Sequence, residues 1–192
     1  MKVTDVDKTA VLNFLRSEHC KVVRQAHYKQ YDHYFIFDGN DPDAARLRHR
    51  EDEFIGEDGQ VYQTRSRLTL TSQAERQEFP NAVMLSRSRY LAEADRSLRF
   101  YREYFAPDQE LEVCKDRLRW HIIYQDTDFA VNLDRLLKPD LPGHFLEIKS
   151  RTWSRTDAER KAGLIATMLQ QIGVALDTAE RQEYAEIALR SA

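Results

Sequence analysis

Cations recur at every second position in several segments of the sequence. Side chains two apart on a β-strand point to the same face, so each segment would present its cations together. Guanidinium groups bind phosphate oxygens through paired hydrogen bonds, and lysine adds a compact positive charge. Segments with this spacing hold Arg46, Arg48 and Arg50; Arg65 and Arg67; Arg87 and Arg89; Lys115, Arg117 and Arg119; and Lys149 with Arg151. The spacing predicts a sheet face that binds a phosphate-rich anion.

A single strand of this kind has a simpler explanation, because antiparallel sheets commonly keep one face polar and solvated. Several such strands together favour an anion site, since like charges on neighbouring strands repel one another. An exposed surface would normally intersperse acids with the cations. We therefore expect phosphate contacts from Arg48, Arg50, Arg65, Arg67, Arg87, Arg89, Lys115, Arg117 and Lys149.

Other catalytic and metal-binding patterns are weak in this sequence. The six histidines include no His-x-His or His-x-x-x-His spacing, which argues against zinc. Neither the phosphate-binding GxxxxGK[ST] loop nor the dinucleotide-binding GxGxxG pattern occurs. Cys114 lies beside Lys115, a neighbour that can lower a thiol pKa, but without a partner it is expected to be a small buried residue. No catalytic residue is assigned.

Strands are the elements expected to position the cations. Alternating patterns predict them over 21–37, 46–50, 61–71, 83–90, 97–105, 111–124, 129–133 and 145–150, and Asp58-Gly59 is typical of a tight hairpin. A helix is expected to begin near Thr4, and another to run from Thr156 until Gly173 ends it, with a shorter one from Asp177. The prediction is one α+β domain over 1–192 with an antiparallel sheet, and 156–192 as C-terminal helices.

Composition excludes several classes of protein. The 192 residues carry 29 Lys and Arg against 32 Asp and Glu, a net charge of −3, which argues against a globally basic nucleic-acid binder. No apolar run approaches the length of about 20 residues that a membrane helix needs. The N-terminal residues lack an apolar signal core, and Cys20 and Cys114 are too few for a disulfide framework. We expect a reduced cytoplasmic protein without nucleic-acid or membrane partners.

Six short motifs resemble, in order, those of CYTH domains, the triphosphate tunnel metalloenzymes. That superfamily includes class IV adenylate cyclases, thiamine triphosphatases and inorganic tripolyphosphatases. The resemblance runs from about Tyr28 to Ile172, most of the chain. The motifs are Gln30-x-Asp32-x-Tyr34, Leu47-Arg48-His49-Arg50, Leu68-Thr69, Lys115-Asp116-Arg117, Leu133-Asp134 and Gly143-His144-Phe145-Leu146-Glu147-Ile148-Lys149.

The resemblance implies an eight-stranded antiparallel β-barrel, closed into a tunnel and flanked by helices. It carries phosphate contact onto Arg48, Arg50, Lys115 and Arg117, with Arg87 and Arg89 as further candidates. It also implies Mg²⁺ or Mn²⁺ as cofactor, held by Glu147, with a metal-side or water-orienting role for Asp134. The alternative for Glu147 is a structural salt bridge to a neighbouring arginine.

The sequence departs from the family pattern where metal carboxylates are concerned. The N-terminal Glu-x-Glu-x-Lys strand has no counterpart, because the chain opens at MKVTD, where the residues after that strand begin. The late Glu-x-Glu reads Glu147-Ile148-Lys149, and Leu-Thr-x-Lys reads Leu68-Thr69-Leu70-Thr71. Either the first strand is missing from a truncated chain, or this branch binds phosphates without two-metal chemistry.

Three functions follow from the cation pattern and the resemblance. The first is metal-dependent hydrolysis of inorganic tripolyphosphate or of a nucleoside or thiamine triphosphate bound in a basic tunnel. The second is a non-catalytic module that binds polyphosphate or a nucleotide. Adenylate cyclase activity is the third. The expected partner is a triphosphate or polyphosphate small molecule, and a homodimer is one option for an oligomeric state that the sequence does not fix.

Overall fold

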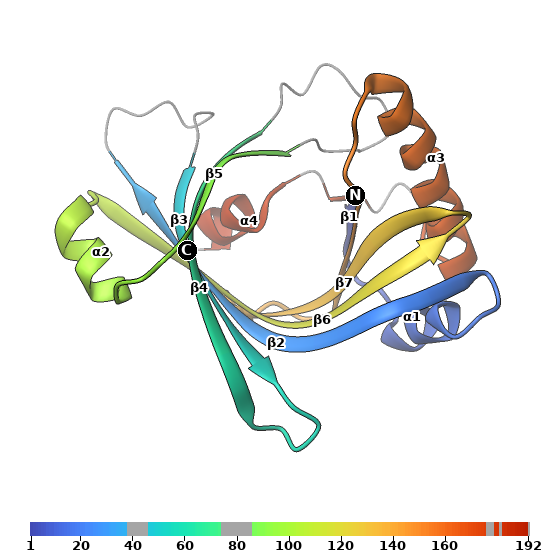
Figure 1. The fold of residues 1–192 in the computed structure, drawn as a ribbon, viewed down its shortest axis with the longest axis horizontal. Coiled ribbons are helices and arrows are strands. Elements are labelled where there is room, and N and C mark those ends of the chain that lie inside the picture. The colour runs from blue at the N-terminus through green and yellow to red at the C-terminus, as the bar shows by residue number, and fades with distance from the viewer. Residues whose placement is uncertain (38–45, 74–85, 176–178, 181, 192) are drawn as a thin grey trace.

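One strongly curved antiparallel sheet organises the chain (Figure 1). Its strands are β1 (Lys2–Val3), β2 (Cys20–Ile36), β3 (Arg46–Ile55), β4 (Val61–Gln73), β5 (Ser86–Glu93), β6 (Gln109–Tyr124), β7 (Thr127–Lys138), β8 (Phe145–Lys149) and β9 (Ala179–Glu180). They pair in the order β5-β4-β3-β2-β6-β7-β8-β1-β9. The computed structural model describes residues 1–37, 46–73, 86–175, 179–180 and 182–191, with backbone alone for 71–73, 86–91, 180 and 191.

The sheet is open, so the predicted closed eight-stranded barrel is wrong. β5 and β9 are the last strands at its two edges, and within the described ranges no pairing joins them. A closed barrel needs its two edge strands to pair with each other, and β9 has only two residues. The chain begins with a short strand, β1, in which Lys2 pairs with Glu147 of β8.

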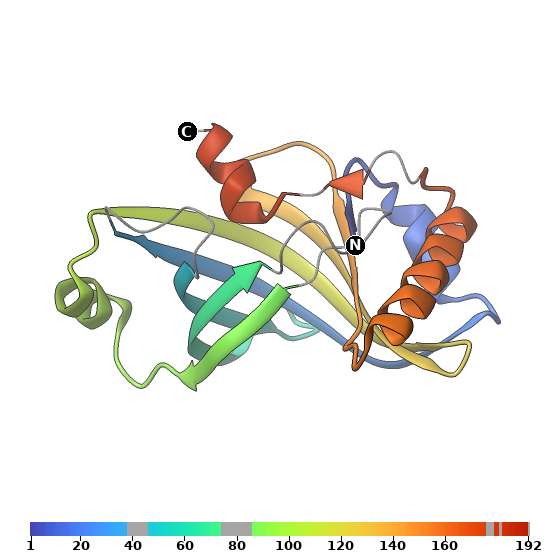
Figure 2. The same cartoon turned by 90° about the horizontal axis from the view of Figure 1, so that it is seen from above.

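An apolar layer covers one face of β6, β7 and β8. Side chains that alternate with the predicted cations are buried there and pack against α1 (Lys8–Leu15) and α3 (Arg155–Ile172), which Figure 2 shows side by side. The predicted division of β6 and β8 into an apolar and a charged face is therefore confirmed. The buried strand residues include Trp120, Ile122, Val131, Leu133, Leu146 and Ile148.

Helix α2 (Leu98–Phe105) occupies a segment predicted to be a strand. Ser97 caps it by accepting a hydrogen bond from the Phe100 amide at 3.3 Å. Tyr101 and Phe105 stack four residues apart, with ring centroids separated by 6.0 Å. The aromatic-rich segment therefore also satisfies a helical period, and the cap decides between the two.

A last helix, α4 (Tyr184–Ser191), lies on the side of the sheet opposite to α1 and α3 (Figure 2). It begins after the Asp177 start predicted from the sequence, which lies outside the described residues. Across the described part of the chain, no helix combines the length and apolar character needed to cross a membrane.

Candidate functional site

The side chains that face α4 form a surface that we call the charged face. Alternation along six strands places them there, and the strand register brings them into rows, such as Asp32 opposite Arg50 and Arg117 opposite Asp134. The charged face comprises Gln30, Asp32, Tyr34, Arg48, Arg50, Asp52, Arg65, Arg67, Thr69, Lys115, Arg117, Asn132, Asp134, Glu147 and Lys149, with Lys2 at its edge.

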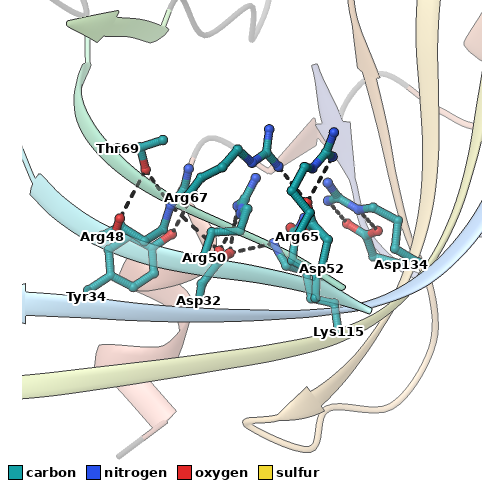
Figure 3. A network of polar contacts seen from close by, with 12 residues as sticks. Asp32, Tyr34, Arg48, Arg50, Asp52, Arg65, Arg67, Thr69, Lys115 and Asp134 are labelled. Carbon is teal, nitrogen blue, oxygen red and sulfur yellow. Dashed lines mark hydrogen bonds and ion pairs between the residues drawn. The ribbon is translucent and has the colours of Figure 1, made fainter. Parts of the chain in front are cut away.

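Asp32 lies at the centre of this face, between three cations (Figure 3). Its carboxylate accepts two hydrogen bonds from Arg50, at 2.5 and 2.7 Å. The Lys115 Nζ lies 3.1 Å and the Arg48 Nε 3.6 Å from the same carboxylate. Burial alone would raise the pKa of Asp32, but Arg50, Lys115 and Arg48 hold it well below its usual range. Asp32 is therefore a permanent negative charge.

Asp52, two residues after Arg50 on β3, is a second carboxylate that pairs with several side chains. It accepts hydrogen bonds from Arg67 at 2.5 Å, from Arg65 at 3.2 Å and from the Gln30 amide at 2.6 Å. Burial opposes ionisation, yet neighbouring cations, Arg50 first, lower the pKa of Asp52. Two arginines of β4 are thus fixed by one carboxylate of β3.

Arg117 connects two further acids. It donates to both oxygens of Asp134, through Nε at 2.5 Å, and its NH2 group reaches Glu147 at 3.3 Å. Glu147 also pairs with Lys149 at 2.9 Å and accepts from Asn132 at 3.2 Å. Burial raises the pKa of Glu147, but Lys149 and Arg117 bring it well below its usual range.

The predicted cations and acids thus meet on one face, with more acidic compensation than the sequence suggested. Asp32 of β2 and Asp52 of β3 stand among the cations and pair with them. Arg87 and Arg89 lie on β5, and their side chains fall outside the described residues. Phosphate contact by these residues stays a prediction.

The two predicted metal ligands are already occupied by hydrogen-bond donors. Asp134 is held by Arg117 and accepts from the Tyr184 hydroxyl at 2.6 Å, while Glu147 has three donors of its own. In the part of the chain that is described, no cluster of three or more His, Cys, Asp or Glu side chains could hold a metal ion. As placed, this donor set does not suit Mg²⁺ or Mn²⁺, which need free carboxylate oxygens. Metal ligation by Glu147 and Asp134 stays a prediction.

Lys115 is a deeply buried cation of the charged face. Its side chain is 2% exposed, and this burial lowers its pKa from 10.5 to about 7, although Asp32 acts in the opposite direction. Lys115 therefore changes charge near neutral pH.

Sequence reasoning missed two residues that contact this face from the ends of the chain. The Lys2 and Lys115 ammonium groups each lie 4.3 Å from the centroid of the Tyr184 ring. Asp52 could have been found, because it continues the two-residue period of Arg48 and Arg50. Nothing in the local sequence around Lys2 or Tyr184 points to this contact, since 182 positions separate them.

Cys114 points away from Lys115, because neighbouring strand residues face opposite sides. Its thiol lies 3.4 Å from a Glu112 oxygen. Burial and this carboxylate raise the pKa of Cys114 to about 12, so the idea that Lys115 lowers it is wrong. Cys114 is a buried, free cysteine, as predicted.

Solved structures with a similar fold include two archaeal proteins and one bacterial protein. The PH1819 protein from Pyrococcus horikoshii matches with a TM-score of 0.71 at 18% identity, over 100% of this chain and 98% of that one. A conserved hypothetical protein from Pyrococcus furiosus matches with a TM-score of 0.62 at 18% identity, over 96% and 97%. A candidate adenylate cyclase from Vibrio parahaemolyticus matches with a TM-score of 0.63 at 16% identity, over 100% and 97%. The chain shares their fold.

This likeness is consistent with the CYTH-like architecture that the motifs predict. No protein-family model matches the sequence, and no curated protein does. At this level of identity the likeness concerns the fold alone. The charged face is the feature of this chain that bears on its function.

Proposed function

We propose that the charged face binds the phosphate chain of a small molecule, either inorganic tripolyphosphate or a nucleoside or thiamine triphosphate. The observation that carries the proposal is an excess of cations. Four carboxylates of this face pair with seven cations: Arg48, Arg50, Arg65, Arg67, Lys115, Arg117 and Lys149. A triphosphate would supply the missing negative charge.

The carboxylates of this face orient the arginines without exhausting them. A guanidinium group has five N–H donors, and Arg50 uses two of its nitrogens on Asp32. Arg50 can therefore hold Asp32 and still donate to a phosphate oxygen. Such fixed donors lose little conformational entropy when the ligand arrives, which favours binding. No dedicated metal ion is needed for this step.

Calorimetric titration with tripolyphosphate in the presence of EDTA tests the proposal. We expect saturable binding, and we expect Arg67→Ala to weaken it about tenfold, the loss of one charge-assisted hydrogen bond. Arg99→Ala, on the 86% exposed side chain of α2, is the matched control and should leave the affinity unchanged. Absence of tripolyphosphate and nucleotide binding by the folded protein would overturn the proposal.

Catalysis is the second candidate, supported by the fold that the chain shares with a candidate adenylate cyclase. With Mg²⁺ or Mn²⁺ present, hydrolysis would release orthophosphate from a triphosphate, whereas a cyclase would release pyrophosphate from ATP. The occupied carboxylates of Asp134 and Glu147 argue for binding alone. Release of either product above the rate of a Lys115→Met, Arg117→Met double variant would establish catalysis at this face.

A further inference from the structure

Three further cations lie on the same side of the sheet as the charged face, toward the turn that joins β6 to β7. Arg119 continues the two-residue spacing of the charged face along β6. Arg24 of β2 pairs with His121 of β6, and Lys21 pairs with Ile123. Because residues directly opposite each other on paired strands share a face, all three cations point to one side. We call Lys21, Arg24 and Arg119 the bulge cluster.

A β-bulge brings Lys21 and Arg24 to the same side of the sheet. Residues three apart on a regular strand point to opposite faces. The register of β2 against β6 shifts between Val22 and Arg24, which makes Val23 an extra residue in β2. The alternation of side chains therefore slips by one position, and both cations face the side that also carries Arg119.

The cations of the bulge cluster have no paired acid, unlike those of the charged face. The seven cations counted there each lie within 3.6 Å of a carboxylate oxygen. In the described part of the chain, no ion pair joins an acid to Lys21, Arg24 or Arg119. The Arg119 Nε–H is buried and lacks an acceptor among the same residues, which costs free energy that a bound anion would restore.

An anion can reach this cluster directly from solvent. The side chains of Lys21, Arg24 and His121 are exposed, and that of Arg119 is partly exposed. The pKa of His121 is lowered by partial burial first, and then by Arg119 and Arg24. Asp128 acts in the opposite direction but does not outweigh them. The local field is therefore positive, and a neutral His121 can still donate one N–H.

We infer that the bulge cluster binds a phosphate dianion, at a second site separate from the one proposed for the phosphate chain. Three cations against the single charge of Asp128 leave a local charge of +2, which a dianion balances. The two guanidinium groups supply forked donors for its oxygens. Along β6, Arg119 lies four residues from Lys115, about 13 Å on an extended strand. The inference does not rest on the proposed function, because it uses none of the seven cations named there.

NMR titration of the ¹⁵N-labelled chain with sodium phosphate, at a mildly alkaline pH where phosphate is a dianion, tests the inference. Sodium chloride at matched ionic strength is the reference for screening. We expect saturable shifts of the backbone amides of Arg24, Arg119 and His121 with phosphate, and not with chloride. Arg119→Met and Arg24→Met should each weaken phosphate binding at least about tenfold.

Arg135→Met is the matched control, because Arg135 is an exposed strand arginine that pairs with Asp116 on the opposite face of the sheet. It should leave the phosphate shifts unchanged, and so should Arg67→Ala on the charged face. Wild-type shifts no larger with phosphate than with chloride would overturn the second site, and so would binding that survives Arg24→Met, whether or not Arg119→Met folds. Neither result would alter the binding of tripolyphosphate expected for the charged face, so the two proposals fail separately.

Discussion

Asp32 is the single residue on which most of the charged face depends, because Arg48, Arg50 and Lys115 share its carboxylate. Removing one partner of a buried ion pair leaves the others uncompensated. We expect Asp32→Asn to lower the free energy of unfolding by about 3 kcal/mol, measured by urea denaturation. Added tripolyphosphate should restore part of this loss, since its oxygens can replace the carboxylate.

A matched substitution separates this effect from a general loss of negative charge. Asp116 is on β6, with a side chain 40% exposed, and it pairs only with His27 among the contacts described. Asp116→Asn should change the free energy of unfolding by less than about 1 kcal/mol. If Asp32→Asn were as stable as Asp116→Asn, the cations would not depend on Asp32 for compensation.

Lys115 predicts a pH dependence of stability. Its pKa is about 7 in the folded chain against an ordinary value of 10.5, so between these values the unfolded chain binds more protons. The free energy of unfolding should therefore rise with pH across this window. Burial also lowers the pKa of the Met1 amine, from 8.0 to about 6, which adds to the rise with pH. Burial raises the pKa of the Cys114 thiol from 9.0 to about 12, which would lower stability as pH rises above about 9. The measurement is therefore best made by urea denaturation between about pH 7.5 and 8.5, on the wild type and on Lys115→Met, which share both groups.

Lys115→Met is the control for this prediction, because it removes the titrating group and keeps an extended side chain of similar length. Its free energy of unfolding should rise less with pH over the same interval. A wild-type stability that stayed level or fell between these pH values would contradict a depressed pKa for Lys115.

The cationic residues of the site could be predicted from two-residue spacing, but their partners could not. Arg48 and Arg50 follow one another on β3, whereas Asp32 reaches them only through the register of β2 against β3. Tyr184 meets Lys115 through a helix that follows most of the sheet in the sequence. The two-residue spacing along a strand determines which face of the sheet a side chain is on. Which side chains meet on that face depends on the register between strands and on where the helix packs.

At the scale of elements, helix α3 has two glycines that should respond oppositely to alanine. Gly173 ends the helix with φ of 84°, where a side chain is strained, so Gly173→Ala should destabilise by about 1 kcal/mol. Gly163 lies inside the same helix, and a Cβ there would meet nothing within 4 Å. Gly163→Ala should stabilise by about 0.5–1 kcal/mol. Thermal unfolding followed by circular dichroism measures both, and shifts of the same sign would contradict this account.

Capping and turn residues predicted where helices and strands end better than the sequence pattern predicted whether a segment is a helix or a strand. Gly173 ends α3 as expected, and Gly59, with φ of 78°, forms the hairpin turn between β3 and β4. Residues 97–105 were assigned to a strand because their aromatics favour strands, although Ser97 caps a helix there. A short segment rich in Phe, Tyr and Arg satisfies both periods, and the Ser97 cap favours the helix.

At the scale of the whole molecule, the sheet curves without closing. The strand count and the antiparallel pairing were close to what the motifs implied, but closure would need the edge strands β5 and β9 to pair, and β9 has only two residues. Helix α4 instead connects the two arms, through Arg46 on β3 and Lys2 on β1. Strand propensities do not predict such a contact between a helix and two distant strands.

The distribution of charge over the whole molecule makes a last prediction, in which two effects have opposite signs. The chain carries a net charge of −3, which would repel a phosphate ligand, while the charged face has more cations than carboxylates. The nearer field dominates, because screening by salt at 0.1 M limits charge effects to about 10 Å. Association with tripolyphosphate, followed by stopped-flow fluorescence, should therefore slow as ionic strength rises. An association rate that increased with salt would mean that the ligand responds to the net negative charge, and not to the charged face.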